Sequence, residues 1–287
     1  AIIYISFISL GLPDALLGAA WPTMYQGMDV PLSYAGGILT YGIPQFVLPN
    51  EVVNRHIDTL KAQGVEIVTS SPIDKSKSID ALFADGFEAV FVGNGADIPQ
   101  TPRGLDTSLE GVWSANDYLT EVNLNTEALP ASIKDAKRVL VVGGGNVAVD
   151  AARTSARLGG EDVQMFCLES RETMPASDEE VEETLAENIA INNGWGPKEF
   201  LKDKKGKVTG VVFKKCLSVF DENHKFAPKY DENDTITVEA DYVITSIGQC
   251  IDWGGLLDGE DMEFVHGNYP KADPFTYQTS VEDIFVG

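Results

Sequence analysis

Basic residues are scarce in this chain of 287 residues. Lys and Arg total 21 against 44 Asp and Glu, which gives a formal net charge of −23, and none of the 21 precedes Arg55. An acidic surface of this kind repels phosphate backbones and anionic lipid headgroups. We therefore expect neither a nucleic-acid partner nor a membrane partner. The acidic residues are scattered between apolar stretches, a pattern typical of a globular chain and not of a disordered one.

Cysteine and histidine are also rare. Cys167, Cys216 and Cys250 are the three cysteines, and they are too widely spaced for a zinc site, a redox dithiol or an iron–sulfur cluster. The three histidines are equally isolated, so we predict no catalytic constellation and no metal site. Sparse, odd cysteine usage is typical of a reducing compartment, which predicts a cytoplasmic protein with each thiol buried.

Long apolar runs are limited to the N-terminus. Residues 1–21 read AIIYISFISLGLPDALLGAAW, which is long enough to be considered as a membrane span. Pro13 and Asp14 interrupt this run, and no basic flank sets an orientation or supplies the n-region of a signal peptide. The alternative is a buried helix, or a strand, turn and helix, at the edge of the core.

After Gly36 the pattern becomes that of an α/β protein. An apolar strand over 137–142 is followed by a helix over 147–158 and a second strand over 163–168. Residues 199–240 alternate in polarity between turn signals, which predicts an antiparallel excursion. A short strand is also expected over 65–68.

The segment Gly143-Gly144-Gly145-Asn146-Val147-Ala148 matches G-x-G-x-x-A between a strand and a helix. Gly143 permits a tight turn, and Gly145 lets a pyrophosphate approach the backbone amides. Ala148 lets the helix pack closely on the strand, and the helix N-terminus favours an anion. In this context the motif predicts that the chain binds a dinucleotide.

Two residues near the end of the next strand bear on the choice of nucleotide. Glu169 follows Gly143 by 26 positions, where a carboxylate accepts hydrogen bonds from an adenosine ribose and repels a 2′-phosphate. Arg171 is instead suited to bind that phosphate. The alternatives are a solvated strand end for Glu169 and a surface ion pair for Arg171. NAD(H) is favoured, and NADP(H) stays open.

Together, several segments resemble the small subunit of glutamate synthase and its flavin-oxidoreductase relatives. The resemblance covers residues 36–287. The matching segments are GGILTYGIPQFVLPNEVV at 36–53, AVFVGNGADIP at 89–99, GVWSANDYLTEVN at 111–123, RVLVVGGGNVAVDAAR at 138–153, MPASDEE at 174–180 and DYVITSIGQ at 241–249.

This resemblance implies an α/β flavoprotein with two nested dinucleotide-binding, Rossmann-like domains. An NAD(P) domain over 111–244 would be inserted into an FAD domain formed by 36–110 and 245–287. In such enzymes hydride passes from the nicotinamide C4 to the flavin N5 and electrons continue to a partner or an iron–sulfur centre. The implied partner is a larger redox subunit, such as the glutamate synthase large subunit, or a ferredoxin-type protein.

The resemblance also assigns cofactor-binding residues. Close relatives often carry adjacent arginines at the places of Glu169 and Arg171, so the glutamate puts a preference for NADPH in doubt. The residues implied to contact the nicotinamide nucleotide are Gly143, Gly144, Gly145, Asn146, Val147, Glu169, Arg171, Gly248 and Gln249. The residues implied to lie along the flavin are Gly36, Gly37, Gly42, Ile43, Pro44, Gly93 and Gly95.

Residues 1–35 depart from the pattern of the resembled family. A first G-x-G-x-x-G loop for the flavin is expected about thirty residues before Gly36, but Gly11, Gly18 and Gly27 do not form it. Residues 7–22 instead resemble the first helix of a major-facilitator transporter. We therefore expect a chimeric or misassembled reading frame joined within 33–37, with an FAD domain that is truncated at residue 287 and binds FAD weakly or not at all. The alternatives to an active oxidoreductase are a catalytically silent NAD(P)-binding fragment and a membrane-anchored, transporter-derived chimera.

Overall fold

The chain folds into two compact units. The computed structural model describes residues 3–6, 42–68, 73, 78–93, 95–96, 98–125, 128–265 and 269–287. One unit comprises residues 99–248, and the other combines residues 1–98 with 249–287. The predicted inserted domain, 111–244, lies within the first unit, whose boundaries fall twelve residues earlier and four residues later than predicted (111 − 99 and 248 − 244). Which cofactor each unit binds stays a prediction.

A five-stranded parallel sheet forms the centre of the 99–248 unit. Its strands are β4 (Val112–Ser114), β5 (Arg138–Val142), β6 (Asp162–Cys167), β7 (Ala190–Asn193) and β11 (Tyr242–Thr245), in the order β4-β11-β5-β6-β7. The chain leaves β5 towards β6 on one side and later returns to pair β11 on the other side of β5. This change of direction places a topological switch point at the carboxyl end of β5, where open parallel sheets bind ligands.

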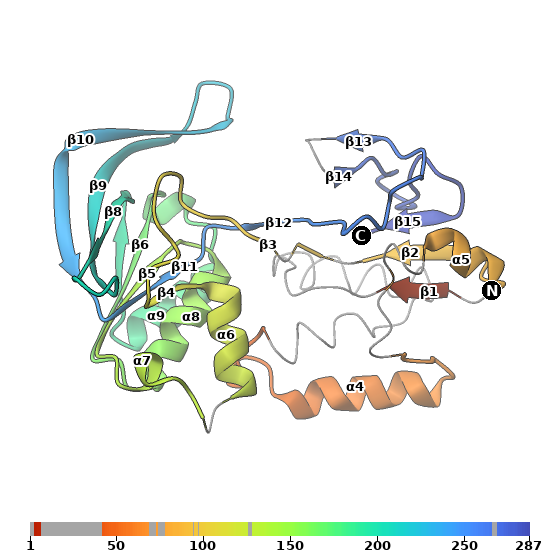
Figure 1. Ribbon diagram of the computed structural model, residues 1–287, viewed down its shortest axis with the longest axis horizontal. Coiled ribbons are helices and arrows are strands. Elements are labelled where there is room, and N and C mark those ends of the chain that lie inside the picture. Colours follow the sequence, from red (N-terminus) through yellow and green to blue (C-terminus); the bar gives the residue numbers. More distant parts are fainter. Residues whose placement is uncertain are drawn as a thin grey trace. The chain divides into compact units, whose positions relative to one another are not determined.

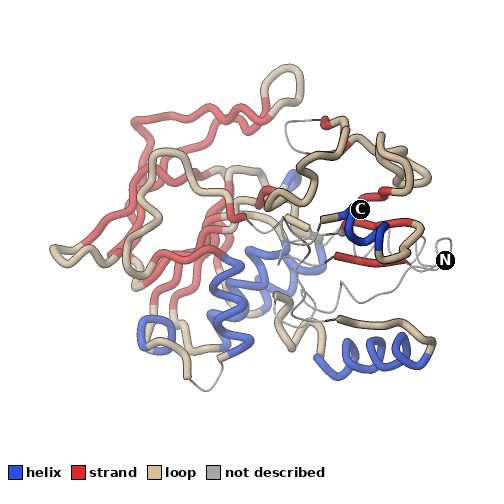
Figure 2. Tube along the Cα trace, turned by 45° about the vertical axis from the view of Figure 1, so that its right-hand side comes forward, coloured by secondary structure: helices blue, strands red, loops and turns tan. Residues whose placement is uncertain are grey.

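Helices cover one face of this sheet, and Figure 2 shows them gathered on one side of its strands. They are α6 (Ala115–Leu124), α7 (Ala131–Lys134), α8 (Asn146–Arg157) and α9 (Asp178–Ala186), and a 3-10 turn, η1 (Arg171–Thr173), precedes α9. Alternate residues of β5 face opposite layers. Val139 and Val141 pack with α6 and α8, whereas Leu140 and Val142 pack on the other side of the sheet.

An antiparallel meander covers the opposite face, as predicted for residues 199–240. Its strands are β8 (Trp195–Lys202), β9 (Val208–Phe220) and β10 (Phe226–Glu239), in the order β10-β9-β8. Phe213 of β9 stacks on Phe166 of β6 with ring centroids 4.0 Å apart, which joins the meander to the sheet. The long β9–β10 hairpin is visible in blue-green in Figure 1.

The second unit has a smaller parallel sheet in the order β1-β2-β15. Its strands are β1 (Ile3–Ser6), β2 (Ala89–Val92) and β15 (Ile284–Val286). The helices are α4 (Asn50–Ala62), which is followed by Gly64 at φ +93°, and α5 (Ile79–Ala84). The core joins Ile79 and Leu82 to Val90 and Ile284. Residues 65–68 do not form the predicted strand.

Two further pairs of short strands occur in the described part of the chain. Strand β3 (Ile98–Pro99) pairs with β12 (Gln249–Cys250), and β13 (Phe264–Val265) pairs with β14 (Tyr269–Pro270).

The N-terminal prediction is only partly covered by the structure. Residues 3–6 form β1, which pairs in parallel with β2 in the register Ile3↔Ala89, so this segment is a strand of the second unit's sheet. The remainder of the apolar run lies outside the described residues. In the described part of the chain, no helix combines the length and apolar character needed to cross a membrane.

Candidate nucleotide-binding site

A glycine loop leaves the carboxyl end of β5 and leads directly into α8. Gly143 has φ +149°, and its N–H donates to the Phe166 carbonyl at 2.8 Å. A Cβ atom on Gly143 would lie 2.1 Å from the carbonyl oxygen of Ser246, which follows β11. The close approach of the β11 end therefore requires glycine at this position.

The next two glycines have opposite surroundings. A Cβ atom on Gly144 would lie 2.9 Å from the Cβ atom of Cys167, at the end of β6. A Cβ atom on Gly145 would have no described atom within 4 Å, so this position borders open space. Gly145 is the N-cap of α8 and is extended, with φ −92° and ψ 174°. This open side of the loop is where a ligand has room.

The N-terminus of α8 suits an anion. The first amide groups of a helix have no acceptor within the helix, and the helix dipole adds partial positive charge there. The first turn of α8 contains no acidic side chain that would cancel this charge, and Arg157 occupies the last turn. An open glycine N-cap above unshielded amides fits a pyrophosphate. The described residues thus fit the phosphate portion of a dinucleotide.

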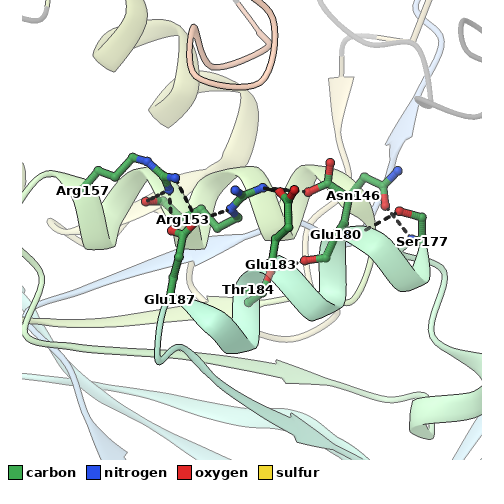
Figure 3. Close-up of polar contacts among 8 residues, drawn as sticks. All are labelled: Asn146, Arg153, Arg157, Ser177, Glu180, Glu183, Thr184 and Glu187. Atoms are coloured by element: carbon green, nitrogen blue, oxygen red, sulfur yellow. Dashed lines mark hydrogen bonds and ion pairs between the residues drawn. The ribbon is translucent and has the colours of Figure 1, made fainter.

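The side chains of Asn146 and Val147 are directed to structural contacts. The Oδ1 atom of Asn146 accepts the Ser177 N–H at 3.0 Å, and Figure 3 shows this contact at the start of α9. Val147 packs against the core on the helix side of the sheet. Of these two predicted residues, we therefore expect the backbone amides, and not the side chains, to face a cofactor.

Charged residues hold α9 along α8. The Arg153 side chain is only 7% exposed and contacts three carboxylates of α9, those of Glu180 at 3.1 Å, Glu183 at 2.6 Å and Glu187 at 2.8 Å (Figure 3). Arg157 also contacts Glu187, at 2.5 Å. Burial raises the pKa of Glu187, but hydrogen bonds from the two arginines outweigh it and hold that pKa below 4.5.

The β6–α9 loop is tied to the glycine loop. The Ala176 N–H donates to the Gly144 carbonyl at 3.0 Å, next to the contact between Asn146 and Ser177. Ser177 also caps α9, because its side chain accepts the Glu180 N–H at 3.3 Å. The charged contacts between α8 and α9 therefore also fix the two loops at the carboxyl edge of the sheet.

Glu169 and Arg171 occupy different places. The Oε2 atom of Glu169 lies 3.3 Å from where a Gly144 Cβ would stand, so its carboxylate lies over the glycine loop. The Arg171 guanidinium contacts the Asp178 carboxylate at 2.9 Å. The structure thus brings Glu169 to the loop, whereas Arg171 forms the surface ion pair considered as its alternative.

The remaining predicted residues lie elsewhere in the chain. Gly248 has φ +97°, and its carbonyl accepts the Gln100 N–H at 2.9 Å, while Gln249 begins β12. In the second unit, Gly42 and Ile43 are half-buried and Pro44, Gly93 and Gly95 are buried, with Gly93 directly after β2. Gly36 and Gly37 lie outside the described residues.

Sequence reasoning missed Ser246 and Ala176, whose backbones shape the glycine loop. Both act through main-chain atoms, so their side-chain types carry no signal. The only sequence hint at Ser246 is its place within DYVITSIGQ at 241–249, one of the segments that carry the resemblance.

The cysteines differ from one another. Cys167 and Cys216 are buried, but Cys250 is exposed, so the prediction that all three are buried is wrong. Burial, together with the nearby Glu169 carboxylate, raises the pKa of Cys167 to about 11, which keeps its thiol protonated. Among the described residues, no group of His, Cys, Asp and Glu side chains is placed to hold a metal ion.

Residues 23–287 match the family described as "Pyridine nucleotide-disulphide oxidoreductase". Relatives include the "NADP(+)-dependent formate dehydrogenase subunit beta" of Moorella thermoacetica, 31% identical over 97% of this chain and 39% of that protein. Another is the "Putative glutamate synthase [NADPH] small chain" of Cereibacter sphaeroides, 30% identical over 96% of this chain and 67% of that protein. The "NADPH-Fe(3+) oxidoreductase subunit beta" of Geobacter sulfurreducens is 31% identical over 86% of this chain and 36% of that protein. The chain thus spans less than two fifths of the length of the Moorella and Geobacter proteins.

Solved structures show the same fold. FprA from Mycobacterium tuberculosis, in complex with NADPH, superposes with a TM-score of 0.70 over 99% of this chain and 78% of that chain, at 15% identity. Thioredoxin reductase from T. acidophilum superposes with a TM-score of 0.56 over 98% of this chain and 88% of that chain, at 17% identity.

These findings do not support the expected junction within 33–37. The family match begins at residue 23, upstream of that junction, and the Moorella alignment covers 97% of the chain. The pairing of β1 with β2 agrees, since it makes residues 3–6 part of the second unit's sheet. The suggestion that residues 1–35 derive from a transporter therefore has no support.

Proposed function

The chain belongs to the pyridine nucleotide-disulphide oxidoreductase family, and from this membership we propose that its 99–248 unit binds NAD(H) for hydride transfer to FAD. The single observation that carries the proposal is the open Gly145 N-cap at the carboxyl end of β5. The two other glycines of the loop leave no comparable space, because a Cβ atom added at Gly143 or Gly144 would meet backbone or side-chain atoms.

The position of Glu169 supports a preference for NADH over NADPH. The pyrophosphate would bind at Gly145, and the adenosine would extend over Gly144 towards the end of β6. The Glu169 carboxylate, 3.3 Å from the position of a Gly144 Cβ, would accept hydrogen bonds from the ribose hydroxyls. The same carboxylate would repel a 2′-phosphate. Because the Moorella, Cereibacter and Geobacter relatives carry NADP or NADPH in their names, this preference would separate the chain from them.

When bound, the two cofactors would supply the redox chemistry, which is transfer of a hydride from the reduced nicotinamide to the flavin. We assign the chain's residues to binding and orientation. Amides of Gly145, Asn146 and Val147 would hold the pyrophosphate, and Glu169 would fix the ribose. Gly248 and Gln249, where the chain passes from one unit to the other, would lie near the nicotinamide, as the resemblance implies. No acid, base or nucleophile is required of the protein in this reaction.

Flavin binding is assigned to the second unit, through Gly36, Gly37, Gly42, Ile43, Pro44, Gly93 and Gly95. Of these, Gly93 and Gly95 follow the carboxyl end of β2, and Gly95 has φ +67°. Residues 7–12, which follow β1, read FISLGL and not the G-x-G-x-x-G of a pyrophosphate loop. This departure favours a second candidate function, a unit that binds NAD(H) but holds FAD weakly or not at all.

A larger redox partner is proposed as the destination of the electrons. The relatives are named as subunits or small chains of multi-subunit enzymes. By analogy, a partner subunit or an iron–sulfur centre would oxidise the reduced flavin. The two candidate partners are a glutamate synthase large subunit and a ferredoxin-type protein.

Anaerobic reduction of the reconstituted chain tests the proposal. The full chain is incubated with FAD, freed of excess flavin, and titrated with NADH without oxygen while the flavin absorbance is recorded. We expect NADH to bleach the flavin band. Gly145→Asp places a carboxylate in the phosphate space and should abolish the bleaching without releasing FAD, which makes it the control.

The outcomes separate the two candidates. A chain that binds NADH but retains no FAD is the NAD(H)-binding unit of the second candidate. A chain that binds neither NADH nor NADPH contradicts both, and so does bleaching by Gly145→Asp at the rate of the original chain.

A further inference from the structure

Arg171 is the one basic residue between positions 158 and 197. It lies two residues after Glu169, on the loop that borders the glycine loop, so it is the cation nearest in sequence to the ribose site. Its backbone is held in η1 by a capping box, in which the Ser170 N–H donates to the Thr173 Oγ1 atom at 3.2 Å. Arg171 is therefore a cation on a defined turn, and its availability to a phosphate depends on what its guanidinium contacts.

The Asp178 carboxylate forms an ion pair with the Arg171 guanidinium. The Arg171 Nη2 atom donates to the Asp178 Oδ1 atom at 2.9 Å, and the two side chains are 41% and 87% exposed. Asp178 is the first residue of α9, and the Asn146–Ser177 contact holds this end of the helix beside the glycine loop. The pair therefore lies on the segment that connects Glu169 to α9, beside the contact between Ser177 and Asn146.

We propose that Asp178 is a specificity-determining residue that excludes NADPH by occupying Arg171. This inference rests on the proposed binding of NAD(H) at the glycine loop. A guanidinium binds a phosphate through paired, charge-assisted hydrogen bonds, and a carboxylate already engaged with it competes for the same donors. Glu169 repels the phosphate directly, and Asp178 removes the compensating cation, so the two carboxylates act on the same group by different routes.

Because both side chains of the pair are exposed, the ion pair can be removed by substitution without unfolding the chain. Ion pairs between exposed side chains contribute little to folding, so loss of the Asp178 charge should leave the fold intact. Arg171 would then be free to turn towards a phosphate, and one carboxylate would no longer repel it. We expect Asp178→Asn to strengthen NADPH binding about ten-fold, the scale of one charge-assisted hydrogen bond, and to change NADH binding by less than about two-fold.

The test compares Asp178→Asn with Glu179→Gln in the full chain. Glu179 is also exposed and also lies in the first turn of α9, so its substitution removes the same charge from the same helix end. Dissociation constants for NADH and NADPH are measured by isothermal titration calorimetry for both variants and the unchanged chain. Adding Arg171→Ala to Asp178→Asn should return NADPH binding to the original level.

The ratio of the two dissociation constants decides the inference. A ratio that shifts towards NADPH in Asp178→Asn and not in Glu179→Gln supports it. Equal shifts in both variants would mean that overall charge and not Arg171 is responsible, and no shift in either would mean that Arg171 does not reach the phosphate. Either result overturns the inference while NADH binding leaves the proposed function standing, whereas absence of any nucleotide binding overturns both.

Discussion

Substitution of Gly145 by alanine separates the stability of the glycine loop from its ability to bind a nucleotide. Gly145 has φ −92° and ψ 174°, an extended conformation open to any residue. A methyl group there would have no described atom within 4 Å. Alanine is a slightly poorer N-cap than glycine, which destabilises the fold, but it also reduces the conformational entropy of the unfolded chain, which stabilises the fold. These effects oppose each other, so the free energy of unfolding should change by less than about 1 kcal/mol.

The same methyl group should interfere strongly with binding, because it would occupy the space proposed for the pyrophosphate. Loss of one charge-assisted hydrogen bond from an amide to a phosphate oxygen costs about 1.5–3 kcal/mol. At about 1.4 kcal/mol for each factor of ten, NADH affinity should fall by about ten- to a hundred-fold.

Gly143→Ala is the matched control, because its methyl group meets the protein itself. Its Cβ atom would lie 2.1 Å from the Ser246 carbonyl oxygen, so the backbone must shift, at a cost of about 3 kcal/mol or more. Urea unfolding and calorimetric titration with NADH measure both variants. Unchanged NADH affinity in a folded Gly145→Ala chain would refute the placement of the pyrophosphate, and an unchanged midpoint for Gly143→Ala would refute the loop geometry.

Four further predictions concern the charged contacts, the ribose site and the cysteines. Arg153→Met should lower the free energy of unfolding at neutral pH by about 2–3 kcal/mol, because it leaves three carboxylates without their buried cation; Arg153→Lys should lose less. Because the pKa of Glu187 is lowered in the folded chain, its ionised carboxylate stabilises the fold at pH values above 4.5, the ordinary pKa. This stabilisation is lost as the pH falls through the lowered pKa. When the free energy of unfolding is measured against pH, the decrease in acid should therefore be smaller in Arg153→Met. Glu169→Ser should weaken NADH binding about ten-fold and bring NADPH affinity close to it, as measured by calorimetry. A thiol reagent at pH 8 should modify Cys250 in the folded chain but Cys167 only after unfolding, as peptide mass spectrometry would show; equal rates would contradict the assigned burial.

The sequence predicted the elements around the glycine loop because their signals are local. The short apolar run that ends at Gly143 predicts a strand, and the amphipathic run after the glycines predicts a helix. The alternating polarity of residues 199–240 likewise predicted the meander. These features depend on neighbours in the sequence, so they can be derived without a structure.

Other features depend on contacts between distant segments. The Ser246 carbonyl lies against Gly143 only because β11 pairs with β5, about a hundred residues away in the chain. Whether Arg171 is free or paired depends on the position of α9, and whether Cys250 is buried depends on how β12 pairs with β3. The same limit explains the predicted strand at 65–68, where apolar residues occur without a neighbouring strand to pair with in the described sheets.

A crystal structure of the full chain with NADH bound tests the central claim most directly. The account predicts the pyrophosphate against the amides at the start of α8, over Gly145, with a ribose hydroxyl within hydrogen-bond distance of the Glu169 carboxylate. Density for the nucleotide at any other place in the chain, or a ribose directed away from Glu169, would contradict it.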